Sequence, residues 1–132
     1  MKLSNKYSKN EKLKSKKAIE LLFAKGKSIN ALSIRVTYVA KEVSEGIPVN
    51  MGVTVSKKNI KIAVNRNLIK RRIREAYRLN NNKLKTQLKN TNSELNLMFI
   101  YTSKQILPYK DIEDKIKVLL TRLIELSEVV DE

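Results

Sequence analysis

The sequence predicts an α+β fold of the two-layer sandwich type, in which helices pack on a mixed β-sheet. Two segments rich in β-branched residues, 33–41 and 49–56, predict strands, and a turn with Gly46 and Pro48 separates them. A nearly continuous apolar run at 94–102 predicts a further, buried strand. Segments with helical periodicity precede, separate and follow these strands. The expected order is therefore α-β-β-α-β-α, with room for one more small strand.

The composition predicts a single binding domain over residues 1–132 without an active site of its own. The chain contains no Cys and no His, which excludes the usual zinc sites and the Ser-His-Asp and Cys-His nucleophilic sites. The sequence shows no acidic cluster for a metal and no glycine-rich phosphate loop. No apolar run reaches the roughly 18 residues of a membrane span. The net charge of +15 favours nucleic acid or an anionic membrane surface as partner. The lack of Cys and of a signal-peptide pattern predicts a cytoplasmic location.

The N-terminal third predicts a mobile basic arm at 1–10 and then a short helix at 15–24. Ser15 can cap this helix, and Gly26 lies at its C-terminal cap position. Its apolar side is formed by Ala18, Ile19, Leu21, Leu22 and Phe23. Residues 28–32 are expected to form a loop. The two strands that follow, at 33–41 and 49–56, are expected to pair as an antiparallel hairpin.

A helix predicted from Lys61 to about Leu79 carries the densest positive charge. Between Lys57 and Arg78 there are nine Lys or Arg and one Glu, a net charge of +8. At 3.6 residues per turn the side chains of this helix separate by face. The apolar arc consists of Ile69, Ile73, Ala76 and Tyr77. The cationic ridge consists of Arg66, Asn67, Lys70, Arg71, Arg74 and Arg78. Arg72 alone falls off this ridge.

Such a ridge differs from an ordinary solvated face. Solvated faces mix charges, because like charges four residues apart repel by a few tenths of a kcal/mol. A polyanion offsets that repulsion, and guanidinium groups and the amide of Asn67 suit phosphate oxygens and base edges. The helix lacks a broad face of Trp, Phe and Leu, which disfavours a membrane surface. The ridge therefore predicts a contact with nucleic acid.

The C-terminal half completes the predicted layer of helices. Leu84 and Leu88 are four residues apart and indicate a short helix within the Asn- and Lys-rich segment 80–93. Residues 111–128 form a clear amphipathic pattern, with Asp111 at the end where the helix dipole favours an acid. Residues 128–132 are expected to fray. From Gln105 onward seven acids face four bases, so positive charge is concentrated in the first two thirds of the chain.

At the basic segment the sequence resembles a known family, the protein subunit of bacterial ribonuclease P. The segment reads VSKKNIKIAVNRNLIKRRIREAYR. That family has a strand ending in an SKK-type run and then a helix with an Arg-Asn-x-x-Lys-Arg-x-x-Arg-Glu core. Here the core is Arg66-Asn67-Leu68-Ile69-Lys70-Arg71-Arg72-Ile73-Arg74-Glu75. The KGKS run that follows Phe23 is a weaker match to the same family.

The resemblance implies a fold and a division of labour. The family has a left-handed βαβ crossover, as in the second domain of a ribosomal small-subunit protein. Its RNA subunit hydrolyses the phosphodiester bond with Mg²⁺, which RNA and substrate mainly hold. The protein binds that RNA and the 5′ leader of precursor tRNA as a monomer in a 1:1 complex. The implied contacts with the catalytic RNA are Lys57, Lys58, Lys61, Arg66, Asn67, Lys70, Arg71, Arg74 and Arg78. No catalytic or metal-binding residue is expected in the chain itself, and neither DNA nor a membrane is expected as partner.

The resemblance also implies a leader-binding cleft between the N-terminal helix and the sheet, in which aromatic side chains stack on unpaired bases. Phe23 matches one aromatic residue of that cleft, with a core position as the alternative. The family often has a second Phe four residues earlier, where this chain has Ile19. Tyr38 is a third cleft residue by expectation, with core or cross-strand packing as the alternative. Tyr77 and Tyr101 are predicted to lie in the core.

Two other functions fit a basic helix on a sheet. A structural RNA-binding protein of the ribosomal type would bind RNA tightly without affecting cleavage of a leader. A DNA-binding domain would place the basic helix in a major groove. The absence of a short partner helix and turn before the basic helix disfavours the DNA-binding alternative.

Overall fold

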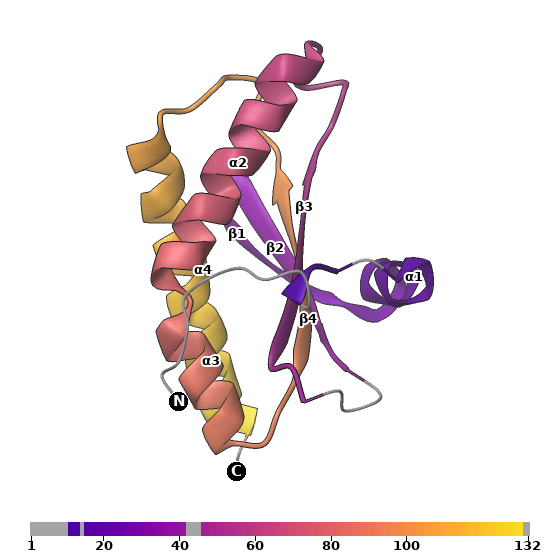
Figure 1. The fold of residues 1–132 in the computed structure, drawn as a ribbon, viewed down its shortest axis with the longest axis vertical. Coiled ribbons are helices and arrows are strands. Elements are labelled where there is room, and N and C mark those ends of the chain that lie inside the picture. The colour runs from indigo at the N-terminus through magenta and orange to yellow at the C-terminus, as the bar shows by residue number, and fades with distance from the viewer. Residues whose placement is uncertain (1–10, 14, 42–45, 131–132) are drawn as a thin grey trace.

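The computed structural model describes residues 11–13, 15–41 and 46–130 (Figure 1). Within residues 127–130 it describes the backbone only. The basic arm expected at 1–10 and the last two residues of the expected tail lie outside the described residues. Residues 128–130 are part of the last helix, and their expected fraying stays a prediction.

A mixed four-stranded sheet and four helices make up the described fold, which confirms the predicted class. The elements are α1 (Lys16–Lys25), β1 (Lys27–Ala31), β2 (Ile34–Ala40), β3 (Val49–Val55), α2 (Ala63–Asn80), α3 (Asn82–Asn90), β4 (Leu95–Tyr101) and α4 (Tyr109–Val130). The strand order is β1-β2-β4-β3. Strand β4 pairs antiparallel with β2 and parallel with β3, and β1 pairs antiparallel with β2.

The predicted hairpin between segments 33–41 and 49–56 is wrong. Strand β4 lies between β2 and β3, so these two strands do not touch along their edges. The hairpin is instead made by β1 and β2, and β1 occupies most of the segment expected to be a loop. The apolar segment of β4 needs hydrogen-bonded neighbours on both edges and cover on both faces, and only a central position supplies them.

The helices cover the sheet unequally. Figure 1 shows α2, α3 and α4 on one face and α1 alone on the other. The main core lies between the sheet and the three helices, where the Tyr77 and Phe99 rings meet with centroids 6.0 Å apart. Tyr77 and Tyr101 are fully buried in it, as predicted. The opposite face is left partly open beside α1, and this asymmetry creates a second surface on the molecule.

The unit β3–α2–α3–β4 joins two parallel neighbouring strands, and it is the unit to which the resemblance assigns a left-handed crossover. The short helix predicted around Leu84 and Leu88 is α3, and both leucines are buried against α4. Helix α2 begins at Ala63, two residues later than predicted. Among the described residues, no helix is both long and apolar enough to cross a membrane.

Candidate nucleic-acid interface

Helix α2 separates its side chains as the sequence predicts. Ile69, Ile73, Ala76 and Tyr77 are buried against the sheet and α4. On the outer side and in the segment before the helix, Lys57, Lys58, Lys61, Asn67, Arg71 and Arg74 are exposed. Arg66, Lys70 and Arg78 are half-buried. We call these nine residues the basic surface. Packing of the apolar arc fixes the direction in which the basic side chains project.

The turn that carries Lys57 and Lys58 is held at several points. Strand β3 ends one residue before Ser56, whose hydroxyl accepts hydrogen bonds from the backbone N–H of Lys58 (3.0 Å) and Asn59 (3.3 Å). The Asn59 amide in turn donates to the carbonyl of Thr102 after β4 (3.4 Å). The two lysines therefore lie on an ordered turn beside the start of α2.

Arg66 has a structural role that sequence reasoning missed. Its Nη1 donates to the carbonyls of Ile60 (2.9 Å) and Lys61 (2.8 Å). These bonds hold the segment that leads into α2, whose N-cap residue, Ile62, makes no side-chain cap hydrogen bond. Arg66 thus stabilises the start of the helix through Nη1, although its guanidinium was expected to belong wholly to the cationic ridge. Helical spacing could not reveal this, because the partners precede the helix.

Two further arginines of α2 have protein partners. Arg72 lies off the ridge, as predicted, and donates from Nη1 to the carbonyl of Leu107 (2.6 Å). Arg78 forms an ion pair with Glu75, in which its Nε donates to Oε1 at 2.7 Å. The Glu75 carboxylate offsets the charge of Arg78. The net positive charge of the basic surface is therefore concentrated toward the start of α2.

The second surface is the sheet face beside α1. Cross-strand partners share a face, and the register places Met98 opposite Thr37 on one side and opposite Gly52 on the other. Gly26 ends α1 directly above this face, because a Cβ there would meet the Thr37 Cγ2 at 2.8 Å and the carbonyl oxygen of Leu22 at 2.2 Å. Leu22 is fully buried although it lies outside the main core cluster. A close contact between α1 and β2 therefore holds α1 along one side of this sheet face.

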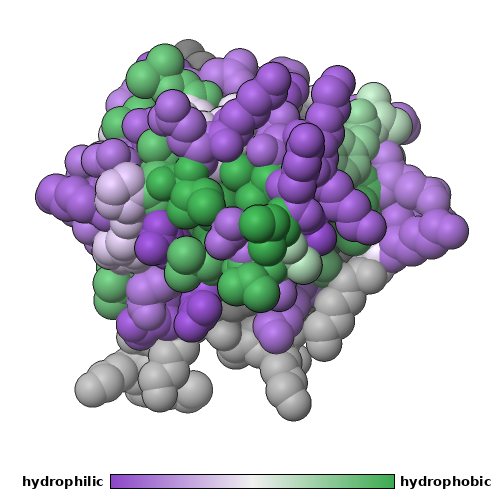
Figure 2. Space-filling view, turned by 90° about the horizontal axis from the view of Figure 1, so that it is seen from above, coloured by the Kyte–Doolittle hydropathy of each residue, from purple (hydrophilic) through white to green (hydrophobic). Residues whose placement is uncertain are grey.

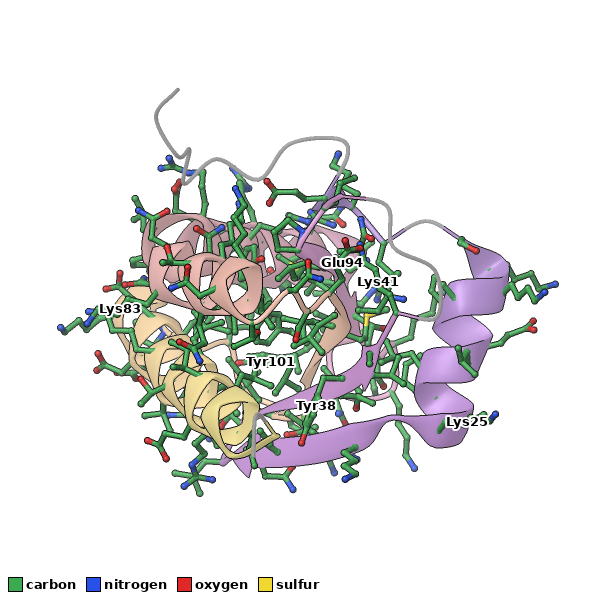
Figure 3. All side chains as sticks on the ribbon, turned by 90° about the horizontal axis from the view of Figure 1, so that it is seen from below. Lys25, Tyr38, Lys41, Lys83, Glu94 and Tyr101 are labelled. Carbon is green, nitrogen blue, oxygen red and sulfur yellow. The ribbon has the colours of Figure 1, made fainter. Side chains whose placement is uncertain are left out.

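The structure brings together two of the three expected cleft residues. Phe23 is 54% exposed on α1, so it is not a core residue, and Ile19 is half-buried one turn earlier. Tyr38 shares the strand face of Ile34 and Val36, and it packs against the main core on the side of the sheet opposite α1 (Figure 3). Burial raises the pKa of the Tyr38 hydroxyl. The expectation that Tyr38 lines the cleft is therefore corrected in favour of core packing.

Arg35 is a charged residue of the second surface that the sequence prediction missed. It shares the face of Thr37, opposite Ile100 of β4, and it is half-buried. Its Nε is buried and finds no hydrogen-bond partner in the part of the chain that the structure describes. The available signal was that Arg35 and Thr37 are two residues apart in β2, since residues two apart share one face of a strand.

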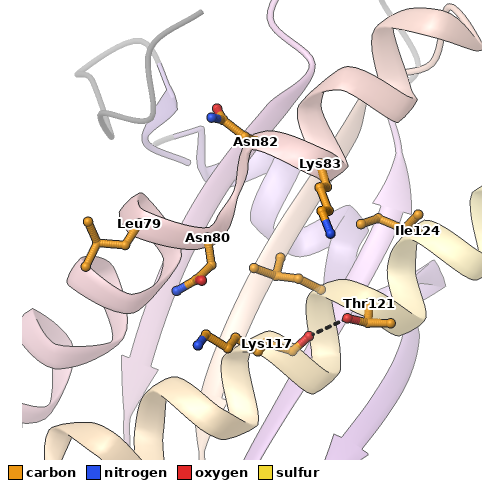
Figure 4. A pocket seen from close by; sticks show the side chains of 8 residues that line it. Leu79, Asn80, Asn82, Lys83, Lys117, Thr121 and Ile124 are labelled. Carbon is orange, nitrogen blue, oxygen red and sulfur yellow. Dashed lines mark hydrogen bonds between the residues drawn. The ribbon is translucent and has the colours of Figure 1, made fainter.

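Two other features do not belong to either surface. A groove of about 400 Å³ lies between the α2–α3 junction and α4, with Lys83 and Lys117 among its lining residues (Figure 4). It contains none of the predicted site residues. Within the described ranges, no group of three or more His, Cys, Asp or Glu side chains could hold a metal ion.

The comparison with protein families decides between the interpretations. A family model described as ribonuclease P matches residues 7–124. The chain belongs to the ribonuclease P protein family. Its curated relatives include the ribonuclease P protein component of Porphyromonas gingivalis, 31% identical over 116 residues, or 88% of this chain and 85% of the relative. The component of Chlorobaculum tepidum is 38% identical over 84 residues, or 61% and 54% of the two chains.

Solved structures share the fold. The ribonuclease P protein of Thermotoga maritima superposes with a TM-score of 0.65 at 23% identity, covering 85% of this chain and 96% of that one. The Staphylococcus aureus protein gives 0.62 at 22% identity, covering 85% and 94%. Members of the family are subunits of an endoribonuclease that processes tRNA, which decides against the ribosomal-type and DNA-binding alternatives.

Proposed function

We propose that this chain binds the RNA subunit of ribonuclease P through the basic surface and guides the 5′ leader of precursor tRNA onto the sheet face beside α1. The observation that carries the proposal is the placement of charge on α2. Its outer side presents basic residues with Glu75 as the only acid, and that acid is paired with Arg78. Like charges held this closely are best accommodated against a polyanion.

The basic surface supplies affinity by neutralising phosphates. Each neutralised phosphate releases condensed counterions, which favours binding at low salt. The flat guanidinium groups of Arg71 and Arg74 are exposed and can take phosphate oxygens in pairs. The Lys57–Lys58 turn adds point charges beside them. These contacts position the protein on the RNA without reading a particular sequence.

The sheet face beside α1 is the proposed place for the leader. Phe23 presents an exposed ring on which an unpaired base can stack, and Ile19 offers apolar bulk one turn away. On the same sheet face, Arg35 is half-buried, and its positive charge favours the phosphates of a leader that lies there. With one aromatic ring on α1 in place of two, we expect weak sequence preference in the leader.

Hydrolysis itself is assigned to the RNA subunit. Mg²⁺ supplies the charge stabilisation for phosphodiester cleavage when RNA and substrate hold it. The protein holds the two RNA molecules near each other as a monomer in a 1:1 complex. The bacterial cytoplasm, where precursor tRNA is matured, is the proposed location. Neither DNA nor a membrane is a proposed partner.

The deciding experiment is leader cleavage of a labelled precursor tRNA by a bacterial ribonuclease P RNA at low Mg²⁺, with and without this protein. We expect cleavage to be faster with the protein. Tight RNA binding without faster cleavage, repeated with the RNA from the same organism, would instead indicate a structural RNA-binding protein.

A further inference from the structure

Three connections of the chain meet at one end of the sheet. They are the β1–β2 turn at 32–33, the segment 56–62 before α2, and the segment 102–108 between β4 and α4. Figure 1 places the start of α2 and the connection after β4 at the upper end of the molecule. This end borders the basic surface but is not part of the sheet face beside α1.

Hydrogen bonds join the three connections into one surface. The backbone N–H of Thr102 donates to the carbonyl of Ser33 at 2.8 Å, and its hydroxyl donates to the carbonyl of Leu32 at 3.4 Å. The side chain of Asn59 donates to the carbonyl of Thr102 at 3.4 Å. The β1–β2 turn is therefore fixed relative to the start of α2.

Large aliphatic side chains are exposed on this end. Leu32 is 86% exposed, Val64 74%, Ile62 61% and Ile106 42%. We call these four residues the apolar cap. Figure 2, seen from above Figure 1, shows hydrophobic side chains gathered in the middle of the surface with hydrophilic ones around them. A cluster of this kind, rimmed by polar groups, is typical of an interaction site.

Two residues of the apolar cap are locally unfavourable to the folded chain. Leu32 has φ of +50°, a left-handed conformation that glycine and asparagine adopt far more readily than leucine. Ile62 occupies the N-cap of α2, where Ser, Thr, Asp and Asn are preferred, and it makes no cap hydrogen bond. Both side chains project into solvent, so burial within the chain does not compensate either choice. Residues that weaken the free protein in this way indicate a role in binding.

The charge around the apolar cap identifies the kind of partner. Lys57, Lys58, Lys61 and Lys104 are exposed in the same connections. None of the residues in the three connections is acidic. An anionic partner is therefore favoured, and a second copy of this chain, with a net charge of +15, is repelled.

We propose that the apolar cap packs against unstacked nucleobases in an unpaired segment of the RNA subunit, while the surrounding lysines hold the flanking phosphates. Single-stranded loops expose the flat faces of their bases. Packing these faces against aliphatic side chains removes apolar surface of both partners from water. This inference rests on the proposed function and adds to it a contact with bases, distinct from the phosphate contacts of α2.

Two substitutions in the full chain test it, Leu32→Gly and Ile62→Ser. The first relieves the left-handed strain and the second supplies a helix cap. Each should therefore raise the melting temperature by a few degrees, roughly 2–6 °C. Each should also weaken binding to the ribonuclease P RNA by about fivefold or more, because apolar surface of the side chain and the base is no longer removed from water. The dependence of affinity on salt should keep its slope, since no cation is removed.

The matched control is Val118→Ser, which removes a 45% exposed aliphatic side chain from the surface of α4. It should leave RNA affinity unchanged. Chemical probing of the RNA should show unpaired bases that the wild type protects and that Leu32→Gly exposes. Higher stability with unchanged affinity would overturn the inference. If Arg74→Ala still weakened binding in that case, the proposed function would stand. Failure of the wild type to bind the RNA would overturn both.

Discussion

Arg66 shows how one residue can serve both folding and binding. Its guanidinium donates to two carbonyls before α2, whereas Arg74 is exposed two turns further on. We expect Arg66→Ala to lower the free energy of unfolding by about 1 kcal/mol, because two charge-assisted hydrogen bonds at a half-buried site are lost. Arg74→Ala should leave the free energy of unfolding unchanged.

Both substitutions should weaken RNA binding, and Arg74→Ala should reduce the slope of log affinity against log salt by about 1. Urea unfolding and salt titrations separate the two effects. Equal stability for both variants would contradict the structural role of Arg66. Unfolding of Arg74→Ala would contradict its assignment to the exposed side.

Phe23 and Tyr38 form a natural pair for testing the proposed leader contact. The sequence places both near the leader, but the structure exposes Phe23 beside α1 and packs Tyr38 against the core on the other face. Phe23→Ala should weaken precursor tRNA binding by the complex about tenfold while mature tRNA binding is unchanged, because only the precursor has a leader to stack.

Tyr38→Phe is the control for this comparison, and it should leave the preference for precursor over mature tRNA as it is. Binding constants for both tRNAs with each assembled complex provide the measurement. If Phe23→Ala weakened both tRNAs equally, the exposed ring would not be contacting the leader.

At the scale of elements, the periodicity of the sequence predicted features that depend only on neighbouring residues. The apolar arc of α2 and the Ser15 cap of α1, with Ala18 N–H donating to the Ser15 hydroxyl at 3.2 Å, follow from spacing alone. Strand pairing did not, because inserting β4 between β2 and β3 depends on contacts far apart in the sequence. The side of the sheet that Tyr38 faces depends on the same pairing.

The join between α1 and β2 depends on Gly26. Its backbone φ of −70° is ordinary, so the requirement for glycine is steric. We expect Gly26→Ala to push α1 away from Thr37 and to lower the free energy of unfolding by about 1–3 kcal/mol, the usual range for overpacking. The preference for precursor tRNA should fall with it, because α1 carries Phe23.

Urea unfolding and precursor binding of Gly26→Ala test this expectation. Gly46→Ala serves as a comparison, since a Cβ there would meet nothing within 4 Å and only its positive φ would matter. Unchanged stability of Gly26→Ala would mean that α1 is not tightly held on the sheet.

At the scale of the whole molecule, charge is polarised. The segment Lys57–Arg78 carries +8 of the net +15, whereas the chain from Gln105 onward is net negative. A protein that neutralises six or more phosphates loses affinity by about 10³-fold when the salt concentration rises from 50 to 200 mM. The basic surface offers that many cationic groups, so we expect a salt dependence of this size.

The same binding should be nearly independent of pH between 6 and 8. The chain has no His, and ordinary carboxylates titrate well below this window. Burial raises the pKa of Tyr38, and burial with the Glu113 carboxylate raises that of Tyr109. A raised pKa favours the neutral phenol in the folded state, so stability declines only as pH rises past the unfolded value of about 10. Affinity measured at several salt concentrations and pH values should therefore fall steeply as salt rises and stay nearly constant between pH 6 and 8. A marked change between pH 6 and 8 would require a titrating group on the RNA or an unrecognised one on the protein at the interface.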